Sequence, residues 1–287
     1  MEKKDIEKKD MGKQEWKRCK ITLTTLEPLH IGGTSHPLSD VHNPIVMLTG
    51  NKPAIPATTL KGAWRSQIER FLINLLKEKN QLDRGEALGL KPCIPASKPS
   101  PDEEHLCDTT RQYKRKPKRG TQRNEYVHSP CTYDNYSDYI CPACYLLGAQ
   151  TLAGFVRVPF LMPREGQADL DTLLYSIRED RATGGAARGS NRGYYVANPG
   201  LTFEGNLEIL QEDPVRGWKF GEKRNKLKYS KVDRWLDNSR ETKLDDITWT
   251  ADSIKKDLIK GCLESITILG GYKSKGCGRV NITVTID

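Results

Sequence analysis

The residues with the clearest chemistry are five cysteines in the middle of the chain. Cys141 and Cys144 form a CPAC knuckle, and two thiolates at this spacing can bind one tetrahedral Zn²⁺. Cys131 lies just upstream, and the fourth ligand would be Cys93 or Cys107. A redox dithiol is the alternative use of such a pair, but the βα context usual for it is absent. We therefore predict a structural Zn²⁺ site within residues 91–145.

A second candidate site is the closing stretch ILGGYKSKGCGRVNITV, residues 268–284. Its glycines, Gly271 among them, permit positive φ and a close approach of the backbone to a ligand. Backbone N–H groups freed in such a loop can form a concavity that binds anions. Lys273, Lys275 and Arg279 could meet phosphates there. The alternative is a hairpin whose glycines serve only the turn and whose cations are solvated.

A third candidate is the start of a predicted helix, IPATTLKGAW, residues 55–64. A helix N-terminus presents unpaired N–H groups and a partial positive charge, so anions bind there readily. The hydroxyl and cationic side chains that could assist are Thr58, Thr59, Lys61 and Arg65. An ordinary helix cap with solvated charges is the alternative.

The elements that must position these residues follow from hydrophobic periodicity. KITLTT (20–25) alternates as a strand, and residues 55–79 repeat apolar side chains at helical spacing. Strand patterns return at 154–162 and 201–210, and a second helix covers 252–265. Two closing strands follow, joined by the glycine-rich stretch. This order predicts an α+β fold, a ferredoxin-like or RRM-like palm with an antiparallel sheet.

The remaining segments read as additions to one palm domain. We expect a charged tail at residues 1–18 and a single domain over 19–287. The expected insertions are the zinc-binding segment 91–145, a thumb-like segment 178–200 and a basic segment 214–246.

Charge and hydropathy limit the possible partners. The chain of 287 residues carries 46 Lys plus Arg against 37 Asp plus Glu, for a formal charge of +9, which favours a polyanion. No apolar run is long enough to cross a bilayer, so no membrane partner is expected. The N-terminus lacks the hydrophobic stretch of a signal peptide, which predicts a cytoplasmic protein.

Three motifs taken together resemble a known family. LHIGG (29–33), IPATTLKGAWRSQIE (55–69) and LGGYKSKGCGRV (269–280) occur in the order found in the RAMP superfamily of CRISPR-associated proteins. More narrowly, the chain resembles the repeated backbone subunit of type III effector complexes. The resemblance implies that the helix start and the glycine-rich loop hold the phosphates of a guide RNA (crRNA). It also implies target RNA and other effector subunits as partners in a filament-like complex.

The same resemblance places a thumb hairpin at residues 178–200. In that family the thumb wedges into the guide–target duplex, and the cations available for it here are Arg178, Arg181, Arg188 and Arg192. The Tyr194–Tyr195 pair could stack on bases. A solvated loop with core tyrosines is the alternative.

Several type III backbone subunits cut target RNA with an aspartate between the first strand and the first helix. Asp40 is the only carboxylate in the corresponding stretch, residues 30–46, and His42 lies closer to the expected position. Either could promote attack by a ribose 2′-hydroxyl, Asp40 as a base or as a ligand for Mg²⁺ or another divalent ion. Two alternatives stay open: a repeat-processing CRISPR endoribonuclease, and a catalytically inactive structural subunit.

Overall fold

The computed structural model describes residues 13–33, 43–48, 50–93, 112–115, 125–128, 131, 139–149, 151–224, 232–237, 244 and 247–286. The chain forms two compact units, each assembled from separate stretches of sequence. The first unit comprises 1–17, 72–156 and 209–254, and the second comprises 18–71, 157–208 and 255–287. Within the described part of the chain, no helix combines the length and apolar character needed to span a bilayer.

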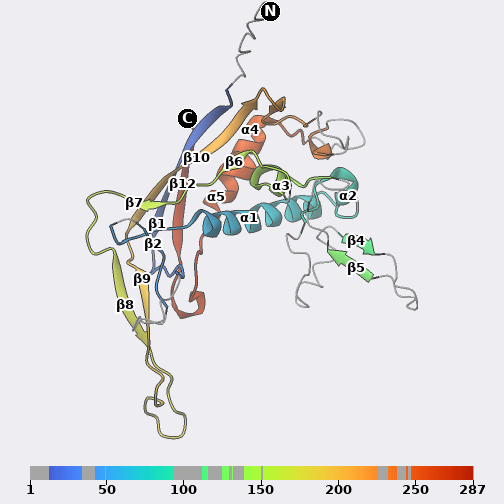
Figure 1. Ribbon diagram of the computed structural model, residues 1–287. Coiled ribbons are helices and arrows are strands. Elements are labelled where there is room, and N and C mark those ends of the chain that lie inside the picture. The colour runs from blue at the N-terminus through green and yellow to red at the C-terminus, as the bar shows by residue number, and fades with distance from the viewer. Residues whose placement is uncertain are drawn as a thin grey trace, which may run out of the picture. The chain divides into compact units, whose positions relative to one another are not determined.

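An antiparallel sheet forms the centre of the second unit (Figure 1). Strand β1 (Glu15–Thr25) pairs with β12 (Val280–Ile286), so that Ile21 lies opposite Val284 and Leu23 opposite Ile282. These four side chains are buried, while the residues between them are more exposed, as the period of two of a strand requires. The alternation thus gives the sheet one apolar face.

Strand β10 (Thr202–Asp213) lies on the other side of β1 and extends the sheet. Two short strands, β6 (Val156–Arg157) and β7 (Met162–Pro163), pair with β10, as does β11 (Trp218–Lys219) at its end. A separate small ribbon pairs β2 (Met47–Leu48) with β3 (Lys52–Pro53).

Two helical segments of the fold bury apolar side chains and contact each other. Helix α1 (Ala57–Glu78) buries every fourth residue, namely Leu60, Trp64, Ile68, Leu72 and Leu76. The second segment runs through α4 (Ala251–Ser253), the π-helical η3 (Ile254–Gly261) and α5 (Cys262–Glu264). The indole N–H of Trp64 donates to the Leu258 carbonyl at 2.7 Å, which ties the first half of α1 to η3.

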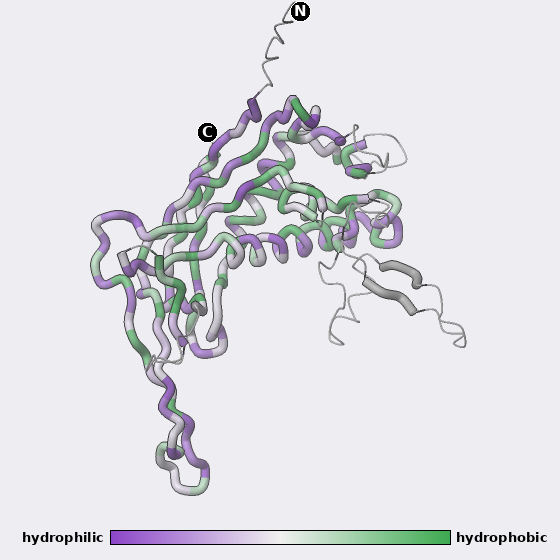
Figure 2. Tube along the Cα trace, viewed as in Figure 1, coloured by the Kyte–Doolittle hydropathy of each residue, from purple (hydrophilic) through white to green (hydrophobic). Residues whose placement is uncertain are grey.

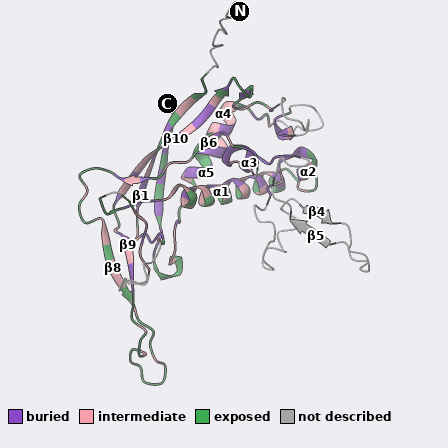
Figure 3. Ribbon diagram, viewed as in Figure 1, coloured by how far each residue is buried: buried purple, intermediate pink, exposed green. Residues whose placement is uncertain are grey.

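A two-stranded hairpin extends from the second unit. It pairs β8 (Asp171–Ser176) with β9 (Arg192–Ala197) in antiparallel register, from Asp171 opposite Ala197 to Ser176 opposite Arg192. The connecting residues 177–191 are exposed along most of their length (Figure 3). They are also largely hydrophilic where they leave the strands (Figure 2), so the hairpin presents a polar surface.

The first unit is organised around aromatic residues. Its remaining elements are α2 (Gly85–Leu88), β4 (Gln112–Arg115), β5 (Glu125–His128), α3 (Pro142–Leu147) and η2 (Arg234–Leu236). The ring of Tyr145 stacks on Phe155 with centroids 4.4 Å apart and meets Trp235 edge-on at 5.3 Å. The buried Arg224 guanidinium donates two bonds to Asp233, each 2.6 Å, so its charge is compensated inside this core.

The α+β class with a mainly antiparallel sheet is confirmed, whereas several element boundaries differ from expectation. β1 begins at Glu15, inside the stretch expected to be a tail. The strand expected at 154–162 is divided between β6 and β7, because only its ends pair with β10. The first strand of the closing hairpin is reduced to one bridge, Ile268 to Arg279.

Candidate nucleic-acid interface

The glycine-rich closing loop runs back against residues 28–30, which follow β1. The N–H of Gly271 donates to the His30 carbonyl at 2.8 Å, and the N–H of Gly278 donates to the Pro28 carbonyl at 2.9 Å. Gly270 has φ +79°, and a Cβ added there would collide with the His30 carbonyl oxygen. Gly270 is therefore required both by its backbone conformation and by the close approach of two backbone segments.

A cavity of about 450 Å³ lies where this loop meets the start of α1. Its lining comes from the segment after β1, the first turns of α1 and the closing loop: Ile31, Gly32, Thr59, Gly62, Ala63, Ser66, Ile268, Leu269, Gly270, Gly271 and Lys273. We call this cavity the glycine groove. Three segments that are distant in sequence thus meet at one concave surface.

The face of α1 that lines the glycine groove carries small side chains. Gly62 is exposed, and a Cβ placed on it would meet nothing within 4 Å. A helical glycine costs about 1 kcal/mol relative to alanine, and packing within the protein does not require this one. Together with Thr59 and Ser66 it leaves the groove open on the side of the helix, while Lys273 supplies positive charge from the loop.

His30 fixes the closing loop to the hairpin. Its side chain is 7% exposed, and its Nδ1 lies 2.7 Å from the Tyr195 carbonyl oxygen. A carbonyl can only accept, so Nδ1 carries the proton and donates it. The imidazole also packs against Tyr272, with ring centroids 4.6 Å apart. His30 therefore joins the segment after β1 to β9 and to the closing loop.

The predicted RNA-binding residues separate into three groups. Thr59, Gly271 and Lys273 line the glycine groove. Arg178, Arg188, Arg192 and Lys275 line a second cavity, the hairpin pocket, where residues 177–191 leave β8 and β9. The others line neither of these two cavities, and they are Thr58, Lys61, Arg65, Arg181 and Arg279. Arg65 lies 3.8 Å from Glu69, and Arg279 lies 3.9 Å from Glu27, so both sit beside carboxylates.

The hairpin tyrosines are arranged differently from the stacking pair suggested by the sequence. Tyr194 is buried at 7% exposure, beside Val196, Cys277 and Tyr272, because β9 turns this side chain inward. The exposed aromatic residue is Tyr175 of β8, at 61%. Gly193 lies opposite it, and a Cβ there would come within 3.3 Å of the Tyr175 ring. Burial along DTLLYS (171–176) does not alternate, so no periodic pattern in the sequence marked Tyr175 as exposed.

Three predicted residues cannot be placed. Asp40 and His42, the candidates for RNA cleavage, lie outside the described residues, as does Cys107.

The remaining four cysteines meet in the first unit. The sulfurs of Cys93, Cys131, Cys141 and Cys144 all lie within 4.8 Å of one another, and all four residues are buried. Sγ of Cys93 is 3.5 Å from that of Cys144 and 3.8 Å from that of Cys141. A tetrahedral Zn²⁺ with bonds of about 2.3 Å separates its sulfurs by roughly 3.8 Å, so the cluster could hold such a metal.

Local structure explains how the cluster forms. Cys141 immediately precedes α3, and Cys144 lies in its first turn. The N–H of Cys141 points at Cys131 Sγ, 3.4 Å away, as donors to metal-bound thiolates do. A hydrogen bond with Cys131 lowers the pKa of Cys141, while hydrogen bonds with Cys141, Cys144 and Cys93, together with burial, raise the pKa of Cys131. One thiolate is thus stabilised by its neighbouring thiols, and a divalent cation would favour the others.

Among the described residues, three cysteines lie outside the cluster, and all three are buried. These are Cys19, Cys262 and Cys277. Burial raises the pKa of Cys262 to about 12, so it stays a thiol near neutral pH.

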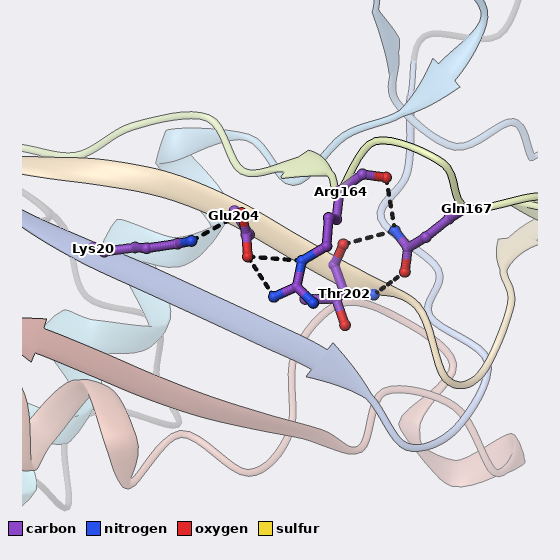
Figure 4. A network of polar contacts seen from close by, with 5 residues as sticks. All are labelled: Lys20, Arg164, Gln167, Thr202 and Glu204. Atoms are coloured by element: carbon purple, nitrogen blue, oxygen red, sulfur yellow. Dashed lines mark hydrogen bonds and ion pairs between the residues drawn. The ribbon is translucent and has the colours of Figure 1, made fainter.

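On the solvent-facing side of the sheet, cations lie beside a carboxylate (Figure 4). Glu204 accepts from the Arg164 guanidinium at 2.5 Å and lies 3.1 Å from Lys20. These two cations lower the pKa of the Glu204 carboxyl. Gln167 bridges the neighbouring backbone, donating to the Thr202 carbonyl at 2.9 Å and accepting from its N–H at 2.7 Å. This face is charge-compensated and has little excess charge to offer a polyanion.

Comparison with known proteins agrees with this description. The sequence model of the RAMP superfamily matches residues 22–281, so the chain belongs to that superfamily. The match covers the end of β1, the glycine groove, the cysteine cluster and the closing loop. Membership indicates a CRISPR-associated RNA-binding protein. No curated protein matches the chain in sequence.

Proposed function

We propose that this chain is the guide-RNA-binding backbone subunit of a type III CRISPR effector complex. The observation that carries the proposal is the glycine groove. A strand end, a helix start and a glycine-rich loop, the three motifs of the family resemblance, converge on one open cavity. Its small side chains leave room for an extended sugar-phosphate chain, and Lys273 provides a phosphate contact. Such contacts read no sequence, which suits a subunit that holds variable guides.

Positioning of target RNA is assigned to the hairpin in this proposal. Arg178, Arg188 and Arg192 lie on it, and Tyr175 offers an exposed ring in place of the buried Tyr194. Other effector subunits would extend the same filament. Cleavage of the target near Asp40, with Mg²⁺ or another divalent ion, remains part of the proposal without a described geometry.

The cysteine cluster has a structural role in this account. We propose that Cys93, Cys131, Cys141 and Cys144 bind Zn²⁺, which would fasten α3 to segments distant in sequence. The metal would supply folding free energy and would not contact RNA.

The test fills the glycine groove without disturbing the fold. Gly62→Leu puts a good helix former where no protein atom lies within 4 Å, so stability is expected to be kept or raised. The same side chain occupies the space proposed for RNA, and affinity for guide RNA should fall by about tenfold or more. Gly62→Ala is the matched control, with a similar gain in helix propensity and little obstruction.

The proposal fails if Gly62→Leu and Gly62→Ala bind guide RNA equally well. Incubation of the chain alone with a CRISPR repeat transcript distinguishes the proposed function from the main alternative. A repeat-processing endoribonuclease would cleave that transcript unaided, whereas a backbone subunit would leave it intact.

A further inference from the structure

His30 has a hydrogen-bond acceptor with no partner among the described residues. The side chain is 7% exposed, and its Nδ1 donates a proton to the Tyr195 carbonyl at 2.7 Å. In the neutral imidazole the other ring nitrogen, Nε2, therefore has a lone pair and no hydrogen. Within the described part of the chain, no donor is bonded to Nε2. Buried polar atoms without a partner are uncommon in folded proteins, so Nε2 is a candidate contact for a ligand.

The edge of the imidazole that carries Nε2 lies beside the glycine groove. A Cβ added to Gly32 would lie 3.7 Å from Nε2, and a Cβ added to Gly271 would lie 3.3 Å from the adjacent Cδ2. Both glycines line the groove. Because neither has a side chain, Nε2 is approached from the groove at the place where two residues leave the ring edge uncovered.

The orientation of the His30 ring is fixed before any ligand binds. The hydrogen bond to the Tyr195 carbonyl holds one side of the ring, and the ring of Tyr272 packs against it with centroids 4.6 Å apart. Tyr194 meets the imidazole edge-on at 6.2 Å. An acceptor whose direction is already set loses little conformational entropy when it forms a hydrogen bond, so it favours a ligand whose donor is correctly placed.

The chemistry of Nε2 limits what it can bind. The ionised phosphate oxygens of a nucleic acid only accept hydrogen bonds, as Nε2 does, so the two cannot bond to each other. The donors for phosphate in the groove are the ammonium of Lys273 and the hydroxyls of Thr59 and Ser66. The donor that an RNA backbone repeats at every nucleotide is the ribose 2′-hydroxyl, which DNA lacks.

We propose that His30 is a specificity-determining residue of the glycine groove, whose Nε2 accepts a hydrogen bond from a ribose 2′-hydroxyl and so favours RNA over DNA. The inference rests on the proposed function and deepens it, because phosphate contacts alone do not distinguish the two polymers. A contact with the sugar also reads no base, so it is compatible with guides of any sequence.

The experiment compares two probes that differ only in the hydroxyl. A fluorescein-labelled oligouridylate and the oligodeoxyuridylate of the same length are titrated with the full chain, and the measured quantity is the Kd of the deoxy probe divided by the Kd of the ribo probe. His30→Asn keeps a donor for the Tyr195 carbonyl, since Nδ2 takes the place of Nδ1, but it has no acceptor in the position of Nε2. The ratio should fall about fivefold through weaker binding of the ribo probe, as for the loss of one hydrogen bond.

Gly32→Ala tests the same contact without altering the histidine. The added methyl group would lie in ordinary van der Waals contact with Nε2, so the fold should be kept while the approach to Nε2 is obstructed, and the ratio should again fall. Gly62→Ala is the matched control. It adds a methyl group to the helix side of the same groove, where nothing lies within 4 Å, and it should leave the ratio unchanged. Thermal midpoints verify the folding of each variant.

Equal losses of affinity for both probes in His30→Asn and Gly32→Ala would overturn the inference, since the effect of the histidine would then be structural. A parent chain that binds both probes equally well would overturn it too. In either case the proposed function stands if Gly62→Leu weakens both probes alike. If Gly62→Leu changes neither affinity and His30→Asn still lowers the ratio, the groove of the proposed function fails and the hydroxyl contact is supported.

Discussion

Two glycines in the closing loop show how one residue type serves two purposes. Gly270 and Gly276 have almost the same positive φ, +79° and +76°. Around Gly276 nothing lies within 4 Å of an added Cβ, whereas at Gly270 the His30 carbonyl occupies that space. The backbone conformation is thus common to both, and the close approach belongs to Gly270 alone.

Substituting the two glycines by alanine should separate these effects. Gly276→Ala carries only the conformational cost, about 1 kcal/mol. Gly270→Ala adds a clash with backbone, so it should cost at least 2 kcal/mol more in unfolding free energy and weaken RNA binding by displacing the loop. Chemical denaturation and RNA affinity measure the two outcomes. Equal destabilisation by both variants would show that the loop does not pack against His30 in this way.

Tyr175 is the other residue that the structure makes prominent. If its exposed ring stacks on a base, Tyr175→Ala should lose about 1–3 kcal/mol of affinity for single-stranded RNA, and Tyr175→Phe should lose little. Binding titrations with both variants test this. Tyr195→Ala is the comparison on the neighbouring strand, and a loss confined to that variant would assign the contact to Tyr195 instead.

At the scale of elements, the cysteine cluster brings the start of α3 together with Cys93 and Cys131. Cys141→Ser should remove the bound Zn²⁺ and lower the thermal midpoint, because the remaining thiols cannot complete a tetrahedral site. Cys277→Ser is the control, since it alters a buried thiol outside the cluster and should leave the metal content unchanged. Elemental analysis of the purified protein measures this. A parent protein without stoichiometric Zn²⁺ would refute the assignment.

The paired charges of the sheet make a prediction about pH. Arg164 and Lys20 depress the pKa of Glu204, so their stabilisation is fully present above its ordinary value of 4.5 and is lost as pH falls through the depressed value. The group is partly solvated, so the contribution is about 1 kcal/mol or less. Glu204→Gln should lower the free energy of unfolding near neutral pH. In acid, the unfolding free energies of the variant and the parent should become more similar. Denaturation at several pH values tests this, and a constant difference would contradict it.

Sequence patterns predicted the helices and strands better than they predicted the tertiary contacts between residues distant in sequence. Helical spacing located α1 from Trp64 and Ile68, and alternation located β1, because burial imposes those periods. The choice of Cys93 as a member of the cysteine cluster could not be made, since the long insertion between it and Cys131 has no periodicity. The burial of Tyr194 could not be predicted either, because it depends on packing against Tyr272 and Cys277, which are distant in the sequence.

The distribution of charge governs the molecule as a whole. The formal charge of +9 is not spread evenly, since the sheet face pairs its cations while the hairpin pocket leaves four unpaired within the described residues. RNA binding should therefore be strongly salt-dependent and largely indifferent to sequence. Within the described residues, cations line a concave surface at both the glycine groove and the hairpin pocket.

Ultraviolet crosslinking of the purified assembly, followed by mass spectrometry of RNA-linked peptides, tests the central claim most directly. We predict co-purifying RNA, with crosslinks in the peptides that carry residues 57–66 and 268–279 on either side of the glycine groove. An assembly without RNA, or crosslinks confined to other peptides, would contradict it.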